Sequence, residues 1–138
     1  MDPISIITTS LALLSAISTG TRLATDFIVG CREAHNDIAA VSQELSDLEF
    51  NVLILKRSDG AGELGQLPED LRQNIRDIMM NCTTVLNDLE ALLCKYQGPG
   101  LDRAAKWALY GRKEVDKIRL SLEAHKRALG LVVEVTTL

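Results

Sequence analysis

Residues 3–21, PISIITTSLALLSAISTGT, form an uncharged stretch at the start of the chain. The stretch combines eight serine or threonine hydroxyls with large aliphatic side chains: Ile4, Ile6, Ile7, Leu11, Leu13, Leu14 and Ile17. As a helix rising about 1.5 Å per residue it would be about 28 Å long, close to the ~30 Å hydrocarbon core of a bilayer. We therefore expect an apolar N-terminal helix that either lies at the centre of a helical bundle or inserts into a membrane.

The residues before this stretch favour a helix start over a secretory signal. Asp2 is a good capping residue, and Pro3 has the backbone angle that a first helical turn needs. A secretory signal would begin with positive charge and end at a small-residue cleavage site, whereas the only early charge here is acidic. We expect the apolar segment to remain on the mature protein.

The spacing of apolar residues predicts four helices, at about 3–32, 36–56, 68–97 and 101–130. The second has apolar residues at alternating intervals of three and four: Ile38, Val41, Leu45, Leu48, Val52 and Leu55. The buried stripe predicted for the third is Leu71, Ile75, Ile78, Cys82, Val85, Leu89 and Leu92. The seam predicted for the fourth is Ala104, Ala108, Val115, Ile118, Leu122, His125 and Leu129.

The segments between these helices set the topology. Residues 57–67 contain three glycines and are predicted to be a flexible loop, and Gly98-Pro99-Gly100 stops the third helix. Two of the three connections are short, which favours antiparallel neighbours. The sequence thus predicts an all-α, up-down antiparallel four-helix bundle that forms a single domain over 1–138. Residues 131–138 are apolar and β-branched, and we expect a further domain to follow them.

Charge is unevenly distributed along the chain. Residues 1–100 carry 7 basic and 14 acidic side chains, whereas residues 101–130 carry 8 basic and 4 acidic ones. A basic last helix can pair with acidic helices of the same bundle or face anionic lipid. Nucleic acid is not expected as a partner, because no aromatic residues are interleaved with the basic ones and the pI is about 5.1.

The sequence has no residue pattern that indicates catalysis. His35 and His125 have no second ligand at metal-binding spacing, and the glycines at 60, 62 and 65 lack the strand and Lys-Ser/Thr of a phosphate loop. Cys31, Cys82 and Cys94 form no paired motif and are expected to be free thiols. We expect no enzymatic activity, no metal and no cofactor.

Three segments together resemble a known family. The opening MDPISI, the block LPEDLRQNIRDIMMNCTTVLNDLEALLCKY (67–96) and RAAKWALYGRKEVDKIRLSLEAHKRAL (103–129) resemble the fungal HeLo-like domain. That domain stands at the N-terminus of fungal STAND (NLR-type) receptors of programmed cell death, which act in innate immunity and heterokaryon incompatibility. The most specific parts are the Asp-Pro-x-Ser-Ile start, the Lys106-Trp107 pair and the Leu-x-x-His-Lys-x-x-Leu ending.

The resemblance implies a cell-death execution domain. Such domains are similar to the four-helix bundles of necroptosis executors: a downstream nucleotide-binding or amyloid module clusters them into homo-oligomers. The N-terminal helix then permeabilises the plasma membrane, so the protein would be cytoplasmic at rest and membrane-bound when active. The family is often glycine-rich in this helix, whereas the equivalent row here has one glycine among five small residues: Thr8, Ala12, Ala16, Gly20 and Ala24.

Insertion energies favour assembly over insertion of single copies. The seven aliphatic residues favour transfer into a membrane by only ~2–4 kcal/mol, and eight hydroxyls oppose it. The row of small residues would allow copies to approach closely and share their hydroxyls. Arg103, Lys106, Arg112 and Lys113 are candidates for contacts with anionic headgroups, and Trp107 and Tyr110 either anchor at the interface or pack at the bundle end. The alternative is a soluble adaptor or oligomerisation module without membrane activity.

Overall fold

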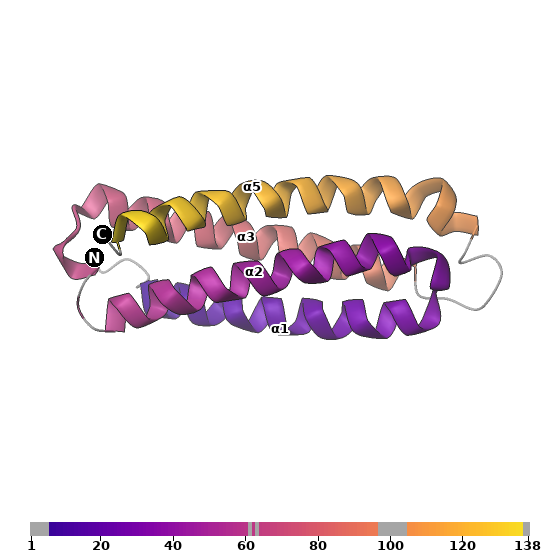
Figure 1. Cartoon of the computed structure of the whole chain (residues 1–138), viewed down its shortest axis with the longest axis horizontal. Coiled ribbons are helices and arrows are strands. Elements are labelled where there is room, and N and C mark those ends of the chain that lie inside the picture. The colour runs from indigo at the N-terminus through magenta and orange to yellow at the C-terminus, as the bar shows by residue number, and fades with distance from the viewer. Residues whose placement is uncertain (1–5, 61, 63, 97–104, 137–138) are drawn as a thin grey trace.

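The computed structural model describes residues 6–60, 62, 64–96 and 105–136, apart from the Glu33 side chain, and contains four long helices (Figure 1). These are α1 (Ile6–Gly30), α2 (His35–Gly60), α3 (Glu69–Lys95) and α5 (Arg112–Thr136). Short 3-10 turns, η1 (Arg32–Ala34) and η2 (Leu64–Gln66), lie in the first two connections, and a π-helical turn, η3 (Trp107–Gly111), leads into α5. The predicted all-α, antiparallel four-helix architecture is confirmed.

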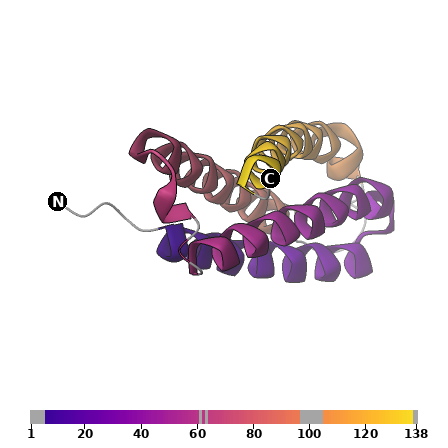
Figure 2. The same cartoon turned by 60° about the vertical axis from the view of Figure 1, so that its left-hand side comes forward.

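The helices pack as a four-cornered bundle in which α1 and α5 lie on one diagonal. α1 packs against α2 and α3, and α5 packs against the same two helices from the other side. Successive helices run in opposite directions, so the α1–α2 and α3–α5 pairs are antiparallel (Figures 1 and 2). The α1–α3 and α2–α5 pairs are parallel neighbours, because the connection from α2 to α3 crosses the diagonal of the bundle. The helices that follow one another in the chain are thus antiparallel, as the connections predict.

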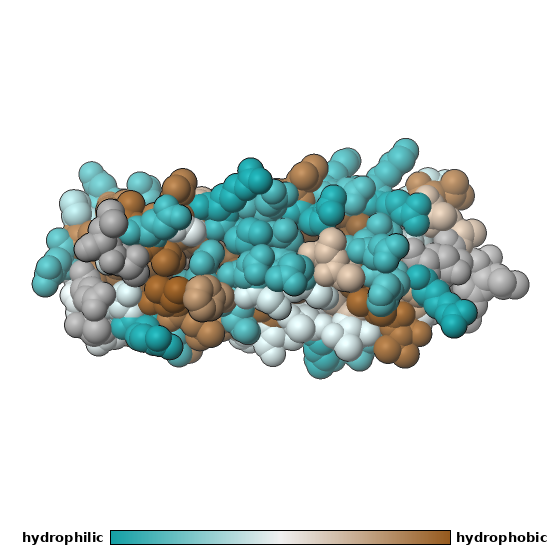
Figure 3. Space-filling model, viewed as in Figure 1, coloured by the Kyte–Doolittle hydropathy of each residue, from teal (hydrophilic) through white to brown (hydrophobic). Residues whose placement is uncertain are grey.

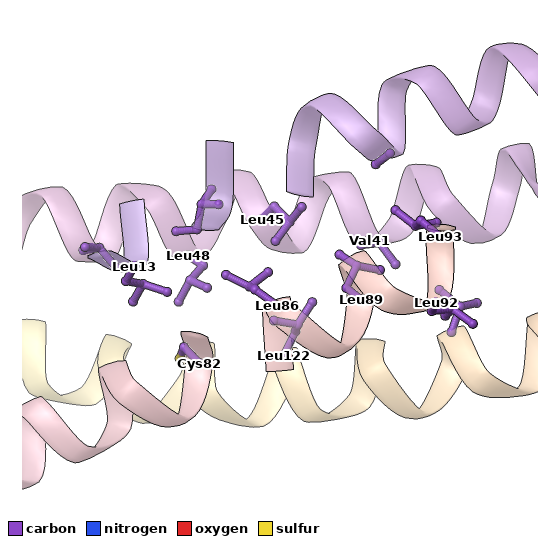
Figure 4. Packing of buried hydrophobic residues seen from close by; sticks show 14 of the residues in the cluster. Leu13, Val41, Leu45, Leu48, Cys82, Leu86, Leu89, Leu92, Leu93 and Leu122 are labelled. Atoms are coloured by element: carbon purple, nitrogen blue, oxygen red, sulfur yellow. The ribbon is translucent and has the colours of Figure 1, made fainter. Parts of the chain in front are cut away.

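The core is aliphatic along most of its length. Leu45 and Leu48 of α2, Leu86 and Leu89 of α3, and Leu122 of α5 meet there, as Figure 4 shows. All six seam residues predicted for α2 are buried. In α3 the predicted stripe is too narrow: Leu71, Ile78 and Val85 are only partly buried, whereas Met79, Leu86 and Leu93 are buried. The buried face of α3 is therefore wider than the predicted stripe.

The π turn corrects the seam predicted for the fourth helix. Counting back in sevens from Leu129 through Leu122 and Val115 leads to Ala108, yet Ala108 is exposed and Trp107 is fully buried. A π turn adds one residue to the helical repeat, which moves every earlier side chain round by one position. Ala104 lies outside the described residues. His125 is only half-buried, and its Nδ1 lies 2.6 Å from the carbonyl oxygen of Ser121.

Two helices, α2 and α5, end later in the chain than predicted. Helix α2 continues to Gly60, so residues 57–60 are helical where a flexible loop was expected. Helix α5 continues to Thr136 through the β-branched run, six residues beyond the predicted end. Val132 and Val133 are partly buried against the core. Tertiary packing here overrides the weak helical preference of β-branched side chains.

We predict that Gly111→Ala destabilises the bundle, because a Cβ at this position would lie 2.3 Å from Cε3 of Trp107. The indole is itself fully buried and cannot move aside, so the overlap should cost about 2 kcal/mol or more in the free energy of unfolding. Urea denaturation followed by circular dichroism measures this. The matched control is Gly65→Ala, where an added Cβ meets nothing within 4 Å. Equal denaturation midpoints for the two variants would contradict the packing described for Trp107.

Candidate functional site

Among the described residues, α1 is the single helix long and apolar enough to cross a bilayer. In its most apolar stretch 39% of the residues are buried inside the bundle. Length and composition of this kind are also found in the core helices of soluble proteins, so the placement of each side chain matters more than the total.

The candidate membrane-inserting residues divide between two sides of α1. Ile6, Leu13 and Ile17 are buried among the other helices, and Leu14 is half-buried. Ile7 and Leu11 are on the surface, with Leu11 50% exposed. Ile4 lies outside the described residues. Between Ile6 and Thr21 the exposed side of α1 carries hydroxyl, alanine and aliphatic groups and no charge. Figure 3 shows pale, nearly neutral surface in the middle of the lower edge of the molecule, where α1 lies, with hydrophilic and apolar residues on either side.

The small residues of α1 wind from the surface into the core. Thr8 and Ala12 are exposed, Ala16 is half-buried, and Gly20 and Ala24 are buried. A four-residue step overshoots one helical turn, so the row rotates about 40° with each step. A Cβ at Gly20 would lie 3.6 Å from Leu45 and 3.7 Å from Leu89, which is ordinary packing distance. In this state the second half of the row packs against α2 and α3.

Ion pairs link α5 to α2 and α3. Lys126 of α5 lies 2.9 Å from Glu44 and 3.3 Å from Asp47 of α2, and these carboxylates raise the pKa of the Lys126 ammonium. Lys95 of α3 lies 3.3 Å from Glu114 of α5. In the part of the chain that the structure describes, no ion pair joins α1 to another helix.

The buried indole of Trp107 forms the centre of a cluster at one end of the bundle. Its ring lies 5.0 Å from that of Phe27 at the end of α1 and makes an edge contact at 5.7 Å with Tyr96 after α3. Its Nε1 donates a hydrogen bond of 3.0 Å to Asp37 Oδ2 in the first turn of α2. Burial is the main reason why the pKa of the Tyr96 phenol is raised. The alternative in which Trp107 packs at the bundle end is the one observed.

The candidate headgroup-binding residues lie at the same end. Lys106 and Lys113 are exposed, and Arg103 is outside the described residues. Arg112 is also on the surface, but its Nε donates a 3.2 Å hydrogen bond to Asp37 Oδ2. The i,i+4 spacing predicts an Arg112–Asp116 pair instead, and that prediction is wrong. Tyr110, unlike Trp107, faces solvent.

A second charged cluster, which the sequence analysis missed, lies at the start of α3. Arg76 is buried, and its Nη2 donates to Glu69 Oε1 at 2.7 Å and to Gln73 Oε1 at 2.8 Å. Glu69 also pairs with Arg72. The hydrogen bond from Arg76 lowers the pKa of the Glu69 carboxyl. The seven-residue spacing of Glu69 and Arg76, two helical turns, was the available signal.

The described residues contain free thiols and side chains of the kinds that bind metals. They include no group of three or more His, Cys, Asp or Glu residues placed to hold a metal ion. Burial raises the pKa of the Cys82 thiol to about 12, so this thiol stays protonated and unreactive. A hollow of about 600 Å³ lies between α2 and α5, lined by Phe50, Asn51, Lys126 and Leu131 among others.

Comparison with known proteins returns no match to any family model, curated protein or solved structure.

We predict that Asp37→Ala destabilises the bundle by about 1–3 kcal/mol, because it leaves the buried indole N–H of Trp107 without its acceptor. The change should also shift the fluorescence of this single tryptophan. The control is Asp116→Ala, which removes only an exposed ion pair of 3.9 Å and should change stability by less than about 0.5 kcal/mol. Equal losses in the two variants would show that the Asp37 carboxylate does not support Trp107.

We predict that Glu69→Gln makes the stability of the bundle less sensitive to acid. A carboxyl whose folded pKa is lowered contributes stability above its unfolded pKa, near 4.5, and loses it as the pH falls through the folded pKa. Between pH 5 and the acid limit, wild type should therefore lose more stability than the Gln variant. Thermal unfolding at a series of pH values measures this, and parallel curves would exclude a contribution from Glu69.

Proposed function

We propose that this chain is a membrane-permeabilising execution domain of programmed cell death. It rests as a helical bundle, oligomerises on activation and inserts α1 into the plasma membrane. The observation that carries the proposal is the uncharged exposed side of α1 between Ile6 and Thr21, on a helix of membrane-spanning length. The resemblance to the HeLo-like domain supports the same assignment.

The energetics favour release of α1 at a membrane over release in water. The large buried side chains of α1, Ile6, Leu13, Ile17 and Phe27, each contribute about 1.5–3 kcal/mol by leaving water, on the order of 10 kcal/mol together. Exposing them to solvent would forfeit this amount, whereas lipid keeps them out of water. Among the described residues no ion pair joins α1 to another helix, so none of these pairs has to be broken for its release.

The hydroxyls of α1 are less costly in lipid than their number suggests. Ser10 Oγ donates to the carbonyl oxygen of Ile7 at 2.8 Å, and Thr25 Oγ1 donates to that of Thr21 at 2.9 Å. Such bonds within the helix satisfy the hydroxyl proton without a neighbour. The remaining hydroxyls would face one another in an oligomer or line a water-filled path.

Assembly supplies the rest of the insertion energy. A single copy gains only ~2–4 kcal/mol from its aliphatic residues, too little to insert stably. Clustering by a downstream nucleotide-binding or amyloid module would bring several copies of the small-residue row together. Anionic lipids, homo-oligomer contacts and that module are the proposed partners.

The alternative is a soluble adaptor or oligomerisation module. The observation that favours it is the burial of Leu13, Ile17, Gly20 and Ala24, which makes the inner side of α1 an ordinary part of the core. An adaptor would keep α1 packed against α2 and α3 in every state, whereas the execution domain must release it.

We predict that the protein releases dye from anionic liposomes and that Leu11→Lys lowers the release by roughly fifty-fold or more. A lysine near the centre of an inserted helix costs about 2.5–3.5 kcal/mol per copy. Leu11 is half-exposed, so the resting bundle should tolerate the change. The rate should rise more steeply than linearly with protein concentration, because several copies are needed.

The matched control is Leu120→Lys, on α5, where the leucine is 60% exposed and Leu11 is 50% exposed. Trp107 gives an independent readout, since departure of Phe27 from its ring should change the tryptophan emission. An intact protein that releases no dye even when artificially clustered, with unchanged emission, would favour the adaptor.

A further inference from the structure

The π turn presents exposed apolar side chains at one end of the bundle. Leu109 is 62% exposed and Tyr110 is 61% exposed, and Ala105 and Ala108 beside them also face solvent. We call Ala108, Leu109 and Tyr110, between the buried Trp107 and Gly111, the η3 tip. Figure 3 shows apolar surface at the right-hand end of the molecule, where η3 lies in Figure 1.

The η3 tip is held in place by the residues that flank it. Trp107 and Gly111, on either side of Ala108, Leu109 and Tyr110, are both buried and pack against each other. Trp107 is fixed in turn by Phe27, Tyr96 and Asp37. The exposure of Leu109 and Tyr110 is therefore a consequence of the fold and not of a frayed helix end.

Positive charge surrounds this apolar tip. Lys106, Arg112 and Lys113 flank it in sequence, and Arg32 is exposed on η1, which contacts η3. Of the acidic side chains described at this end, Asp37 binds Trp107 and Arg112, Glu114 pairs with Lys95, and Asp26 of α1 is exposed next to Phe27. The lysines at 106 and 113 have no such acidic partner among the described side chains.

We propose that the η3 tip docks the resting bundle end-on to an anionic lipid surface. This inference rests on the proposed membrane function. It identifies the part of the resting bundle that touches the membrane first. Leu109 would enter the boundary of the acyl chains, Tyr110 would lie at headgroup level, and Lys106 and Lys113 would face lipid phosphates. The tip is an exposed apolar segment flanked by cations, which suits the fluid surface of a bilayer better than a shaped protein pocket.

End-on docking places the C-terminal end of α1 beside the membrane. Helix α1 ends at Gly30, and Cys31 has an extended backbone (φ −141°, ψ 94°) before η1 begins. This break at Gly30–Cys31 is the point about which α1 would turn. The N-terminal end of the 25-residue helix lies about 36 Å away along the bundle, so α1 must reverse its direction to enter the bilayer.

The test is flotation of the full chain with vesicles of phosphatidylcholine alone or with added phosphatidylserine. Wild type should float only with the anionic vesicles. Lys106→Gln combined with Lys113→Gln should weaken binding roughly 25-fold, because each cation at such a surface contributes about fivefold. The double variant Leu109→Ser, Tyr110→Ser removes the apolar part of the contact and should abolish flotation. The controls are Lys117→Gln and Leu120→Ser, which alter exposed residues of α5 away from the tip.

Orientation is tested with an environment-sensitive dye on a thiol. Cys94 is exposed near the same end, two residues before Tyr96, whereas Cys31 and Cys82 are buried. A dye on Cys94 should respond to anionic vesicles. A dye on Gly65→Cys, at the opposite end and in a Cys94→Ser background, should not respond.

The outcomes separate this inference from the proposed function. Leu11→Lys should still float and yet release roughly fifty-fold less dye, whereas the η3 tip variants should lose both flotation and dye release. If the tip variants float like wild type, the docking surface is wrong while membrane permeabilisation can stand. If flotation of the wild type depends on the tip residues but the wild type never releases dye, the docking surface is supported and the execution function is excluded. Equal binding to neutral vesicles, or binding to nucleic acid or acidic protein in place of lipid, would overturn the inference.

Discussion

The indole of Trp107 is the contact on which the arrangement of the four helices depends. Phe27 brings the end of α1 to it, Tyr96 the end of α3, and Asp37 the start of α2, while Gly111 joins it to α5. Each contact restricts the others, since the ring can be accommodated only where Gly111 lacks a Cβ and where Asp37 accepts its N–H. The rest of the core is aliphatic and non-directional, so this end fixes the relative positions of the helices.

The helices of the bundle are also held by different kinds of interaction. The ion pairs of Lys126 and Lys95 and the hydrogen bond from Arg112 join α5 to α2 and α3. Helix α1 has no ion pair to another helix among the described residues and buries mainly apolar side chains, which are stabilised by any water-free surrounding. A helix held in this way can exchange a protein interior for a lipid interior at modest cost, which is the physical basis of the proposed function.

The sequence predicted the helices of the bundle well, and the predicted details failed where packing acts across helices. The three- and four-residue spacing in α2 located its buried face correctly, because one amphipathic face meets the core. The exposure of Ala108 could not be foreseen, since a π turn depends on how Trp107 is packed and not on local periodicity. The helical ends at Gly60 and Thr136 likewise depend on tertiary contacts. For the candidate site, composition was enough to predict an apolar first helix and to single out Lys106 as a candidate for headgroup contact. The burial of Leu13 and the hydrogen bond from Trp107 to Asp37 depend on contacts between helices and could not be predicted from composition.

The diagonal connection between α2 and α3 has a consequence for what remains when α1 departs. Since α2 and α3 lie on opposite sides of α5 and each packs against it, the three helices would stay a continuous layer with α5 in the middle. The face vacated by α1 would be an open trough lined by Leu45, Leu86 and Leu89 (Figure 4). Its shape already matches the helix that left it, so the same trough fits the first helix of an adjacent molecule. Under the proposed mechanism, the connection between α2 and α3 would thus leave a binding surface for α1 once α1 is released.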